Sequence, residues 1–274
     1  MRISLVSDRP EHPVLSAMLA ELDVRHRVAV LSAGDADPAA LAAHEARALA
    51  DVYLLEAHSP AALDLARRLE RCGGLVVNGA AATGACQDRV LMAGRLAGAG
   101  LPCPRTWSVP TLGRARRLLA ALHFPLVIKS RLRRPGDLVT QVHGAEEMEA
   151  LMPRWGGEPV ILQQHEDNDG WDVKLWVVGG HAFAARRPTP LVAGASREAV
   201  PVAAGDLSAA WVTAILRVGR EFDLSLYGVD LLVTARGPVI VDVNAFPGYG
   251  GVPGAAAALA AFTDGLSMEA SATA

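Results

Sequence analysis

Short apolar segments alternate with longer amphipathic segments along the first 80 residues of the chain. Strands are expected at 2–7, 27–32, 51–57 and 75–78, and helices between them at 13–22, 38–50 and 60–71. Strands that are apolar throughout and joined by helices are typical of a parallel sheet covered on both faces. The pattern therefore predicts an α/β fold that begins with a Rossmann-like parallel-sheet domain at 1–80. No Gly-x-Gly-x-x-Gly fingerprint follows the first strand, so a nucleotide site is not predicted there.

The second region mixes strands, hairpins and helices in a less regular order. Its strands are expected at 105–109, 125–130, 138–142, 159–165, 171–179, 181–188, 226–233 and 238–243, and its helices at 86–97, 111–122, 144–152, 207–222 and 254–264. Residues 193–206 lack periodicity and are expected to form a loop. Residues 265–274 are expected to be a frayed tail.

Two acidic residues and an amide stand out in the last two predicted strands. Asp242 and Asn244 are two residues apart and therefore point to the same face of their strand. A three-residue hairpin loop at 235–237, with Gly237 in the left-handed position, would place Asp230 directly opposite Asp242. Two carboxylates in that position repel each other unless a cation lies between them. Oxygen ligands of this kind favour Mg²⁺ or Mn²⁺, and the alternative is two unrelated acids on an exposed strand edge.

Cationic residues lie at the ends or along one face of other predicted strands. Lys129 ends an apolar strand, and a lysine held on such a scaffold suits a phosphate group as a point charge. Asp172 and Lys174 share one face of a strand, and Arg186 and Arg187 end its hairpin partner. Positive groups of this kind are the main electrostatic means of stabilising a phosphoryl group in transfer. For each of them the alternative is a solvated surface charge.

The order of these motifs resembles that of the ATP-grasp enzymes over roughly residues 80–262. Asp230, Asp242 and Asn244 match the Asp, Asp/Glu and Asn that hold Mg²⁺ against the ATP phosphates in that family. The resemblance implies an ATP-grasp fold at 81–264, with a small lobe at about 104–165 and a C-terminal lobe at about 166–264. It also implies ATP and Mg²⁺, with Mn²⁺ as a substitute, as cofactors.

The resemblance assigns further nucleotide contacts. Lys129 matches the strand-borne lysine that contacts the phosphates, and Arg89 stands where many ATP-grasp ligases have a lysine that reaches the nucleotide. The segment that begins at Gln163 resembles the linker between the two lobes, whose backbone contacts adenine and whose acid, here Glu166, binds ribose. The remaining candidates for nucleotide binding are Gln164, His165 and Asp172.

The loop at 131–137 takes the position of the Gly-rich loop that covers the phosphates in the family. It departs from the family pattern because Gly136 is its only glycine. Its three arginines, Arg131, Arg133 and Arg134, suit bidentate contacts to a phosphate or a carboxylate, and the alternative is simple solvation.

Two activities from the resemblance compete, and a non-catalytic nucleotide-binding module is a third alternative. In a RimK-type ligase, a carboxylate becomes an acyl phosphate and an amine then displaces the phosphate. Arg186 and Arg187 would orient the carboxylate or stabilise the tetrahedral intermediate, with Lys174 beside them. The Asp-Arg pair at 88–89 also resembles the inositol polyphosphate 5/6-kinases, although their His-Gly loop is absent. Few lysines in the N-terminal region favour the ligase, with a small carboxylate and an amine, amino-acid-like or peptide-like, as substrates.

Composition narrows the remaining classes. The chain has 274 residues with 26 Lys and Arg against 29 Asp and Glu, and a net charge of −3 argues against a nucleic-acid-binding protein. The three cysteines lack metal-ligand spacing, and the first strand leaves no room for a signal peptide, so a reducing cytoplasm is expected. No apolar stretch reaches the about 18 residues that a membrane span requires. The sequence leaves open whether the protein is a homodimer.

Overall fold

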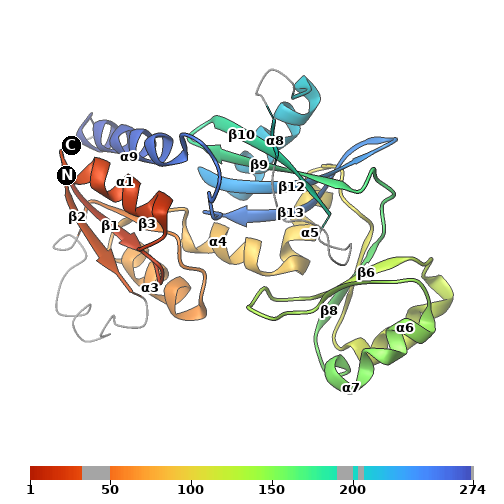
Figure 1. Ribbon diagram of the computed structural model, residues 1–274. Coiled ribbons are helices and arrows are strands. Elements are labelled where there is room, and N and C mark those ends of the chain that lie inside the picture. Colours follow the sequence, from red (N-terminus) through yellow and green to blue (C-terminus); the bar gives the residue numbers. More distant parts are fainter. Residues whose placement is uncertain (33–49, 190–199, 203–206, 273–274) are drawn as a thin grey trace.

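Three β-sheets follow one another along the chain, each with its own helices (Figure 1). The computed structural model describes residues 1–32, 50–189, 200–202 and 207–272. The N-terminal sheet lies beside the five-stranded sheet, which comes last in the chain, and the small sheet between them in sequence projects from the other end of the molecule (Figure 1). Within the described residues, no helix is long and apolar enough to cross a membrane.

The N-terminal sheet is parallel throughout and has the strand order β2-β1-β3-β4, as the apolar strand pattern predicts. Its elements are β1 (Arg2–Val6), α1 (Pro13–Asp23), β2 (Arg27–Leu31), β3 (Val52–Leu55), α3 (Pro60–Arg71) and β4 (Leu75–Val77). The hydroxyl of Ser59 accepts a hydrogen bond from Ala62 N and caps α3, where Pro60 occupies the first turn. The helix expected at 38–50 falls almost entirely outside the described residues.

The small sheet is antiparallel and has the order β5-β8-β6-β7. Its elements are β5 (Thr106–Val109), the 3₁₀ helix η2 (Leu112–Ala121), β6 (Leu126–Ser130), β7 (Val139–Val142), α6 (Ala145–Ala150), α7 (Met152–Trp155) and β8 (Val160–Gln164). The single helix expected at 144–152 is in fact two short helices. Proline lacks a backbone N–H, so Pro153 is placed in the first turn of the second helix rather than inside one longer helix.

The five-stranded sheet is antiparallel and has the order β11-β10-β9-β12-β13. Its strands are β9 (Trp171–Val178), β10 (His181–Pro188), β11 (Val200–Val202), β12 (Leu226–Thr234) and β13 (Gly237–Ala245). Two expectations are corrected here. Residues 200–202 form a strand within the expected loop, whose other residues lie largely outside the described part of the chain. Helix α9 (Ala255–Ala272) continues beyond the expected end at residue 264.

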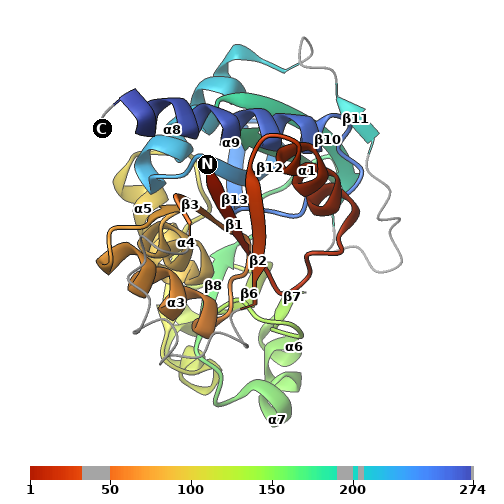
Figure 2. The same ribbon diagram turned by 90° about the vertical axis from the view of Figure 1, so that its left-hand side faces the viewer.

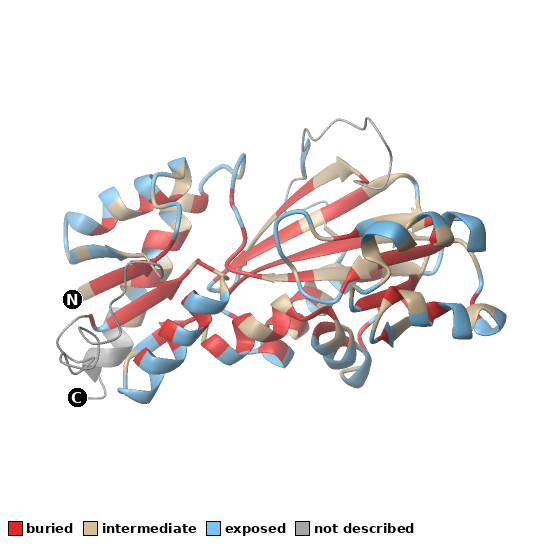
Figure 3. Cartoon of the chain, turned by 90° about the horizontal axis from the view of Figure 1, so that it is seen from below, coloured by how far each residue is buried: buried red, intermediate tan, exposed pale blue. Residues whose placement is uncertain are grey.

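The two faces of the five-stranded sheet are covered differently because side chains alternate along each strand. One face packs against α4 (Ala80–Gln87), α5 (Arg89–Gly98) and α8 (Ala209–Phe222), whose side chains join those of alternate strand residues in one buried cluster. The other face packs at one end against α1, α9 and the N-terminal sheet (Figure 2). Buried residues accordingly follow the strands, and exposed residues follow the outer sides of the helices (Figure 3). The other end of this second face is not covered by helices and is therefore available for a binding site.

Asp88 divides the helix expected at 86–97 into two. Its backbone is extended, with φ −101° and ψ 105°, and its carboxylate accepts hydrogen bonds from Val90 N and Leu91 N. An aspartate in this position satisfies N–H groups that have no partner at the start of a helix. The capping signal explains why α4 ends at Gln87 and α5 begins at Arg89.

The β12–β13 hairpin pairs Asp230 with Asp242 as expected, but by a different route. The turn is one residue shorter than expected, because Thr234 pairs with Gly237 directly. A β-bulge at Val241 compensates, since Leu231 pairs with Ile240 while Asp230 pairs with Asp242. The bulge returns both carboxylates to the same face of the sheet.

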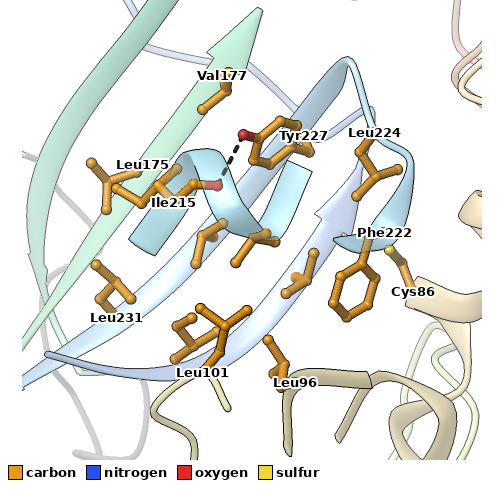
Figure 4. Close-up of a cluster of buried hydrophobic side chains, with 14 of the residues drawn as sticks. Cys86, Leu96, Leu101, Leu175, Val177, Ile215, Phe222, Leu224, Tyr227 and Leu231 are labelled. Carbon is orange, nitrogen blue, oxygen red and sulfur yellow. Dashed lines mark hydrogen bonds between the residues drawn. The ribbon is translucent and has the colours of Figure 1, made fainter. Parts of the chain in front are cut away.

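Gly219 lies where α8 meets the sheet, beneath the ring of Tyr227. The Tyr227 hydroxyl donates a 3.0 Å hydrogen bond to Ile215 O in the same helix (Figure 4). A Cβ atom at Gly219 would lie only 2.5 Å from that hydroxyl oxygen and 2.7 Å from the ring carbon that bears it. Gly94 in α5 is also helical, but a Cβ atom there would meet nothing within 4 Å.

Two alanine substitutions should therefore have opposite effects on the free energy of unfolding. Gly219→Ala forces the buried tyrosine out of place and should lower it by about 2 kcal/mol. Gly94→Ala removes only chain entropy from the unfolded state and should raise it by about 0.5–1 kcal/mol. Urea denaturation followed by circular dichroism measures both, and a shift of the same sign in the two variants would contradict this packing.

Candidate active site

A cleft of about 380 Å³ lies between the small sheet and the uncovered end of the five-stranded sheet. Its lining comes from both sheets and from the segment that joins them. Among the residues named from the sequence, the cleft is lined by Arg89, Lys129, Gln163, Gln164, His165, Asp172, Arg187, Asp230 and Asp242. The fold thus brings residues that are up to about 150 positions apart in the sequence around a single cavity.

The carboxylate pair of the β12–β13 hairpin forms the floor of the cleft at one end. Asp230 is only 7% exposed, and its buried Oδ1 accepts no hydrogen bond, although Lys174 Nζ lies 3.4 Å away. Asp242 Oδ1 is also buried, and it forms an ion pair with the guanidinium of Arg133. Buried carboxylates that face each other need cations nearby, and carboxylate oxygens accept a metal ion as well as the cationic side chains found here. Asn244 follows on the same strand face and adds an amide oxygen. These donors fit a hard divalent cation.

Asp172 adds a third carboxylate to this end of the cleft. Burial, together with the nearby charge of Asp230, raises its pKa to about 6, and the charge of Arg187 opposes the rise. Asp172 Oδ1 is another buried oxygen without a donor. Across the described ranges, no three His, Cys, Asp or Glu side chains meet closely enough to form a metal site by themselves.

Two cations on neighbouring strands face Asp230. Lys174 Nζ lies 3.4 Å from Asp230 Oδ1, and Arg187 Nη2 donates to Asp230 Oδ2 at 3.3 Å. The register explains the geometry, because Asp230 of β12 pairs with Lys174 of β9, and Arg187 of β10 pairs with Asp172 of β9. Lys174 also lies over the ring of Trp176, at 5.7 Å from its centroid.

Lys129 extends from β6 across the cleft toward the hairpin. Its Nζ donates a 3.4 Å hydrogen bond to the carbonyl oxygen of Val241, the residue at the β-bulge. Burial, together with the charges of Arg89 and Arg133, lowers the Lys129 pKa to about 7. A lysine in this state gains strongly from an anion placed beside it.

The pair Asp88–Arg89 holds the 131–137 loop against α5. Asp88 forms a bidentate ion pair with Arg131, in which Arg131 Nη2 donates to Asp88 Oδ2 at 2.7 Å. Arg89 Nη1 donates to the carbonyl oxygen of Ser130 at 2.7 Å and to Asp137 Oδ2 at 2.6 Å. Arg89 still lines the cleft, so it contributes positive charge there while its guanidinium is fixed by the loop.

Arg133 is the residue of this region that the sequence did not single out. Its guanidinium pairs with Asp242 Oδ1 and donates a hydrogen bond to Asn244 Oδ1. Three arginines occur in the loop, and their spacing alone gives no reason to prefer one. Only the fold shows that Arg131 and Arg134 turn to Asp88 and Glu158, whereas Arg133 turns to the hairpin.

Four of the expected site residues are not among those that line the cleft: Lys174, Asn244, Arg186 and Glu166. Arg186 pairs with Val173 and therefore lies on the sheet face opposite Arg187, where it contacts Asp169 at 2.6 Å and the ring of Trp171. Adjacent residues of a strand cannot both reach the same face, so the expected arginine pair is separated.

Glu166, expected to contact ribose, instead forms a 2.6 Å ion pair with Arg236 of the hairpin turn. Its neighbours His165 and Asp167 line the cleft. The side chains of Gln163 and Gln164 are also engaged by the protein, because Gln163 Nε2 donates to Thr106 and Gln164 Nε2 to the backbone. These residues therefore offer the cleft mainly their backbone and apolar surface.

Solved structures with a similar arrangement define the class of the fold as ATP-grasp. A RimK domain ATP-grasp protein from Sphaerobacter thermophilus superposes with a TM-score of 0.80 at 22% identity, over 96% of this chain and 99% of that one. The ATP-grasp ligase PsnB, solved with a phosphomimetic variant of its minimal precursor, Mg and ADP, superposes with a TM-score of 0.73 at 18% identity, over 96% and 97%. The expected fold is confirmed.

The family model for the RimK-like ATP-grasp domain matches residues 87–256. Because this match covers more than half of the chain, the protein belongs to the RimK-like ATP-grasp family. A curated relative, the probable alpha-L-glutamate ligase 1 of Pseudoalteromonas atlantica, is 28% identical over 201 residues. That alignment covers 69% of this chain but only 65% of the relative's own length.

Proposed function

We propose that the protein is an ATP- and Mg²⁺-dependent ligase that joins a carboxylate to an amine through an acyl phosphate. The observation that carries the proposal is the pairing of Asp230 with Asp242 in a cleft that also holds Lys129, because donors for a metal ion and for a phosphate then face one cavity. Membership of the RimK-like family supports the same conclusion. The ATP-grasp fold by itself does not determine which group accepts the phosphoryl group.

The nucleotide would lie along the cleft from the joining segment to the hairpin. The backbone near Gln163 and His165 would border the base, and Lys129 and Arg89 would face the phosphates at the other end. Asp230, Asp242 and Asn244 would hold Mg²⁺, and Mn²⁺ suits the same oxygen donors. When bound there, the metal ion would offset the negative charge of the phosphates.

The cations beside Asp230 would serve the transferring group and the acid substrate. A carboxylate oxygen attacks the γ-phosphorus, the bond to the β–γ bridging oxygen breaks, and ADP leaves. An amine then attacks the carbonyl carbon, phosphate leaves, and the amine nitrogen loses a proton to give the amide. Arg187 and Lys174 face this region and would stabilise the negative charge that develops on the oxygens. Arg186 lies on the other face and is given no part.

The kinase alternative has less support from the contacts in the cleft. Its main motif was the Asp-Arg pair at 88–89, and both side chains have structural partners in the 131–137 loop. The pair is therefore explained without a polyphosphate substrate. Similarity to a probable alpha-L-glutamate ligase makes L-glutamate the first amine to test, with amino acids and short peptides as the carboxylate.

The proposal is tested by incubating the protein with ATP, Mg²⁺, L-glutamate and pooled acids, and by analysing the products by mass spectrometry. A product with the mass of acid plus amine minus water, together with ADP and free phosphate, is expected. A product heavier by one phosphoryl group without free phosphate would show a kinase instead.

Asp242→Asn should abolish turnover while the protein remains folded. The substitution preserves shape but removes the charge that would hold the metal ion against the phosphates. We expect a loss of at least about a thousandfold in ATP consumption, with a far-ultraviolet circular dichroism spectrum like that of the wild type. Asp169→Asn, on the far side of the sheet, is the matched control and should retain activity. Equal activity of the two variants would contradict the assignment.

Nucleotide binding should take up a proton at alkaline pH. Lys129 has a pKa of about 7 in the free protein and is therefore mostly neutral at pH 8, whereas adjacent phosphates favour its charged form and raise the pKa. Binding of ADP with Mg²⁺ at pH 8 should then absorb up to about one proton per nucleotide. Calorimetry in buffers of different ionisation enthalpy measures this number, and Lys129→Arg, which stays charged throughout, should abolish it. A proton number that Lys129→Arg leaves unchanged would contradict this role.

A further inference from the structure

Arg133 lies against the side of the hairpin where we propose a metal ion. Its Nη2 forms an ion pair with Asp242 Oδ1, and its Nη1 donates to Asn244 Oδ1. One guanidinium from the small-sheet side of the cleft thus engages two of the three proposed metal ligands. The contact is enclosed, because the side chains of Arg133 and Asp242 are 18% and 21% exposed. It differs in this respect from an exposed surface ion pair, which contributes little.

The backbone around Arg133 is held in place at several points. Arg133 N donates to the carbonyl oxygen of Gln87 at 3.1 Å. The ion pairs of Arg131 with Asp88 and of Asp137 with Arg89 fasten the two ends of the loop. The part of this contact that can move without unfolding the loop is therefore the long side chain of Arg133 itself.

A guanidinium and a divalent cation cannot occupy the same oxygens. Like charges at contact distance repel strongly, more so in a partly buried site than in water. Arg133 keeps its charge near neutral pH, because burial lowers its pKa only to about 10, with a further contribution from Arg89. Any metal ion that binds Asp242 and Asn244 must first displace the Arg133 side chain. The charged guanidinium of Arg133 then needs a new partner, because it has lost its ion pair in a partly buried place.

We propose that Arg133 is an internal cation that neutralises Asp242 and occupies the amide oxygen of Asn244 in the nucleotide-free protein, and that it gives way to Mg²⁺ when ATP binds. The proposal rests on the metal site proposed above. The phosphates of the nucleotide supply the partner that the displaced guanidinium requires, since arginine binds phosphate oxygens in a bidentate manner. Metal binding is thereby coupled to nucleotide binding, and the site resists filling by a metal ion alone.

The test measures binding of Mn²⁺ alone to the nucleotide-free protein, from the electron paramagnetic resonance signal of the free ion. Arg133→Met keeps an unbranched apolar side chain but removes the charge, and should bind Mn²⁺ about tenfold or more tightly than the wild type. Arg134→Met is the matched control, because Arg134 is the next residue and pairs with Glu158 rather than with the hairpin. It should bind Mn²⁺ like the wild type.

A second measurement repeats the titration with ADP present. ADP should increase the Mn²⁺ affinity of the wild type by a larger factor than that of Arg133→Met, because the variant has no cation to displace. Circular dichroism melts confirm that each variant is folded, and Arg133→Lys, which keeps the charge, should stay close to the wild type.

Two outcomes separate the failure of this inference from the failure of the metal site. If Arg133→Met binds Mn²⁺ no more tightly than the wild type, including when neither binds it detectably, the role given to Arg133 is wrong. If Arg133→Met binds more tightly but the gain survives in Arg133→Met/Asp242→Asn, the ion binds elsewhere and the metal site itself is wrong. Loss of the gain in the double variant is the expected result.

Discussion

The structure of the cleft depends on two carboxylates that face each other across the β12–β13 hairpin. Asp230 and Asp242 are paired residues of adjacent strands, and like charges in that position destabilise a sheet. The surrounding cations respond to this constraint, because Lys174 and Arg187 face one carboxylate and Arg133 faces the other. The site is therefore assembled around two adjacent carboxylates whose charge is balanced by cations from β9, β10 and the 131–137 loop.

The fold leaves the two carboxylates open to the cleft while helices and the N-terminal sheet cover the rest of the five-stranded sheet. Strand alternation directs the apolar residues of β9, β12 and β13 to the helices on one face, and α9 with the N-terminal sheet covers part of the other. Asn78 strengthens that second junction, because its amide donates to Leu226 O and accepts from Ser225 N and Leu226 N. What remains uncovered is the end of the sheet that carries Asp230, opposite Lys129 of the small sheet.

The sequence predicted most of the fold because the strands are strongly apolar and their hairpins are short. It predicted the pairing of the carboxylates but not its cause, since a bulge at Val241 cannot be distinguished from a longer turn by periodicity. The sequence grouped Arg186 with Arg187 because two adjacent arginines look equivalent. The pairing of β10 with β9 places their side chains on opposite faces of the sheet. Arg133 was not singled out because its partners lie on the hairpin, more than a hundred residues away. The local spacing of residues does not reveal contacts over such a distance.

The most direct test of the account follows oxygen from the acid substrate into phosphate. In an acyl-phosphate mechanism the carboxylate oxygen that attacks the γ-phosphorus stays on phosphorus when the amine displaces phosphate. With an acid labelled with ¹⁸O in its carboxylate, the account predicts one labelled oxygen in the released inorganic phosphate, detected by mass spectrometry or ³¹P resonance. Released phosphate without the label, in the presence of amide product, would contradict the central claim that this cleft activates a carboxylate.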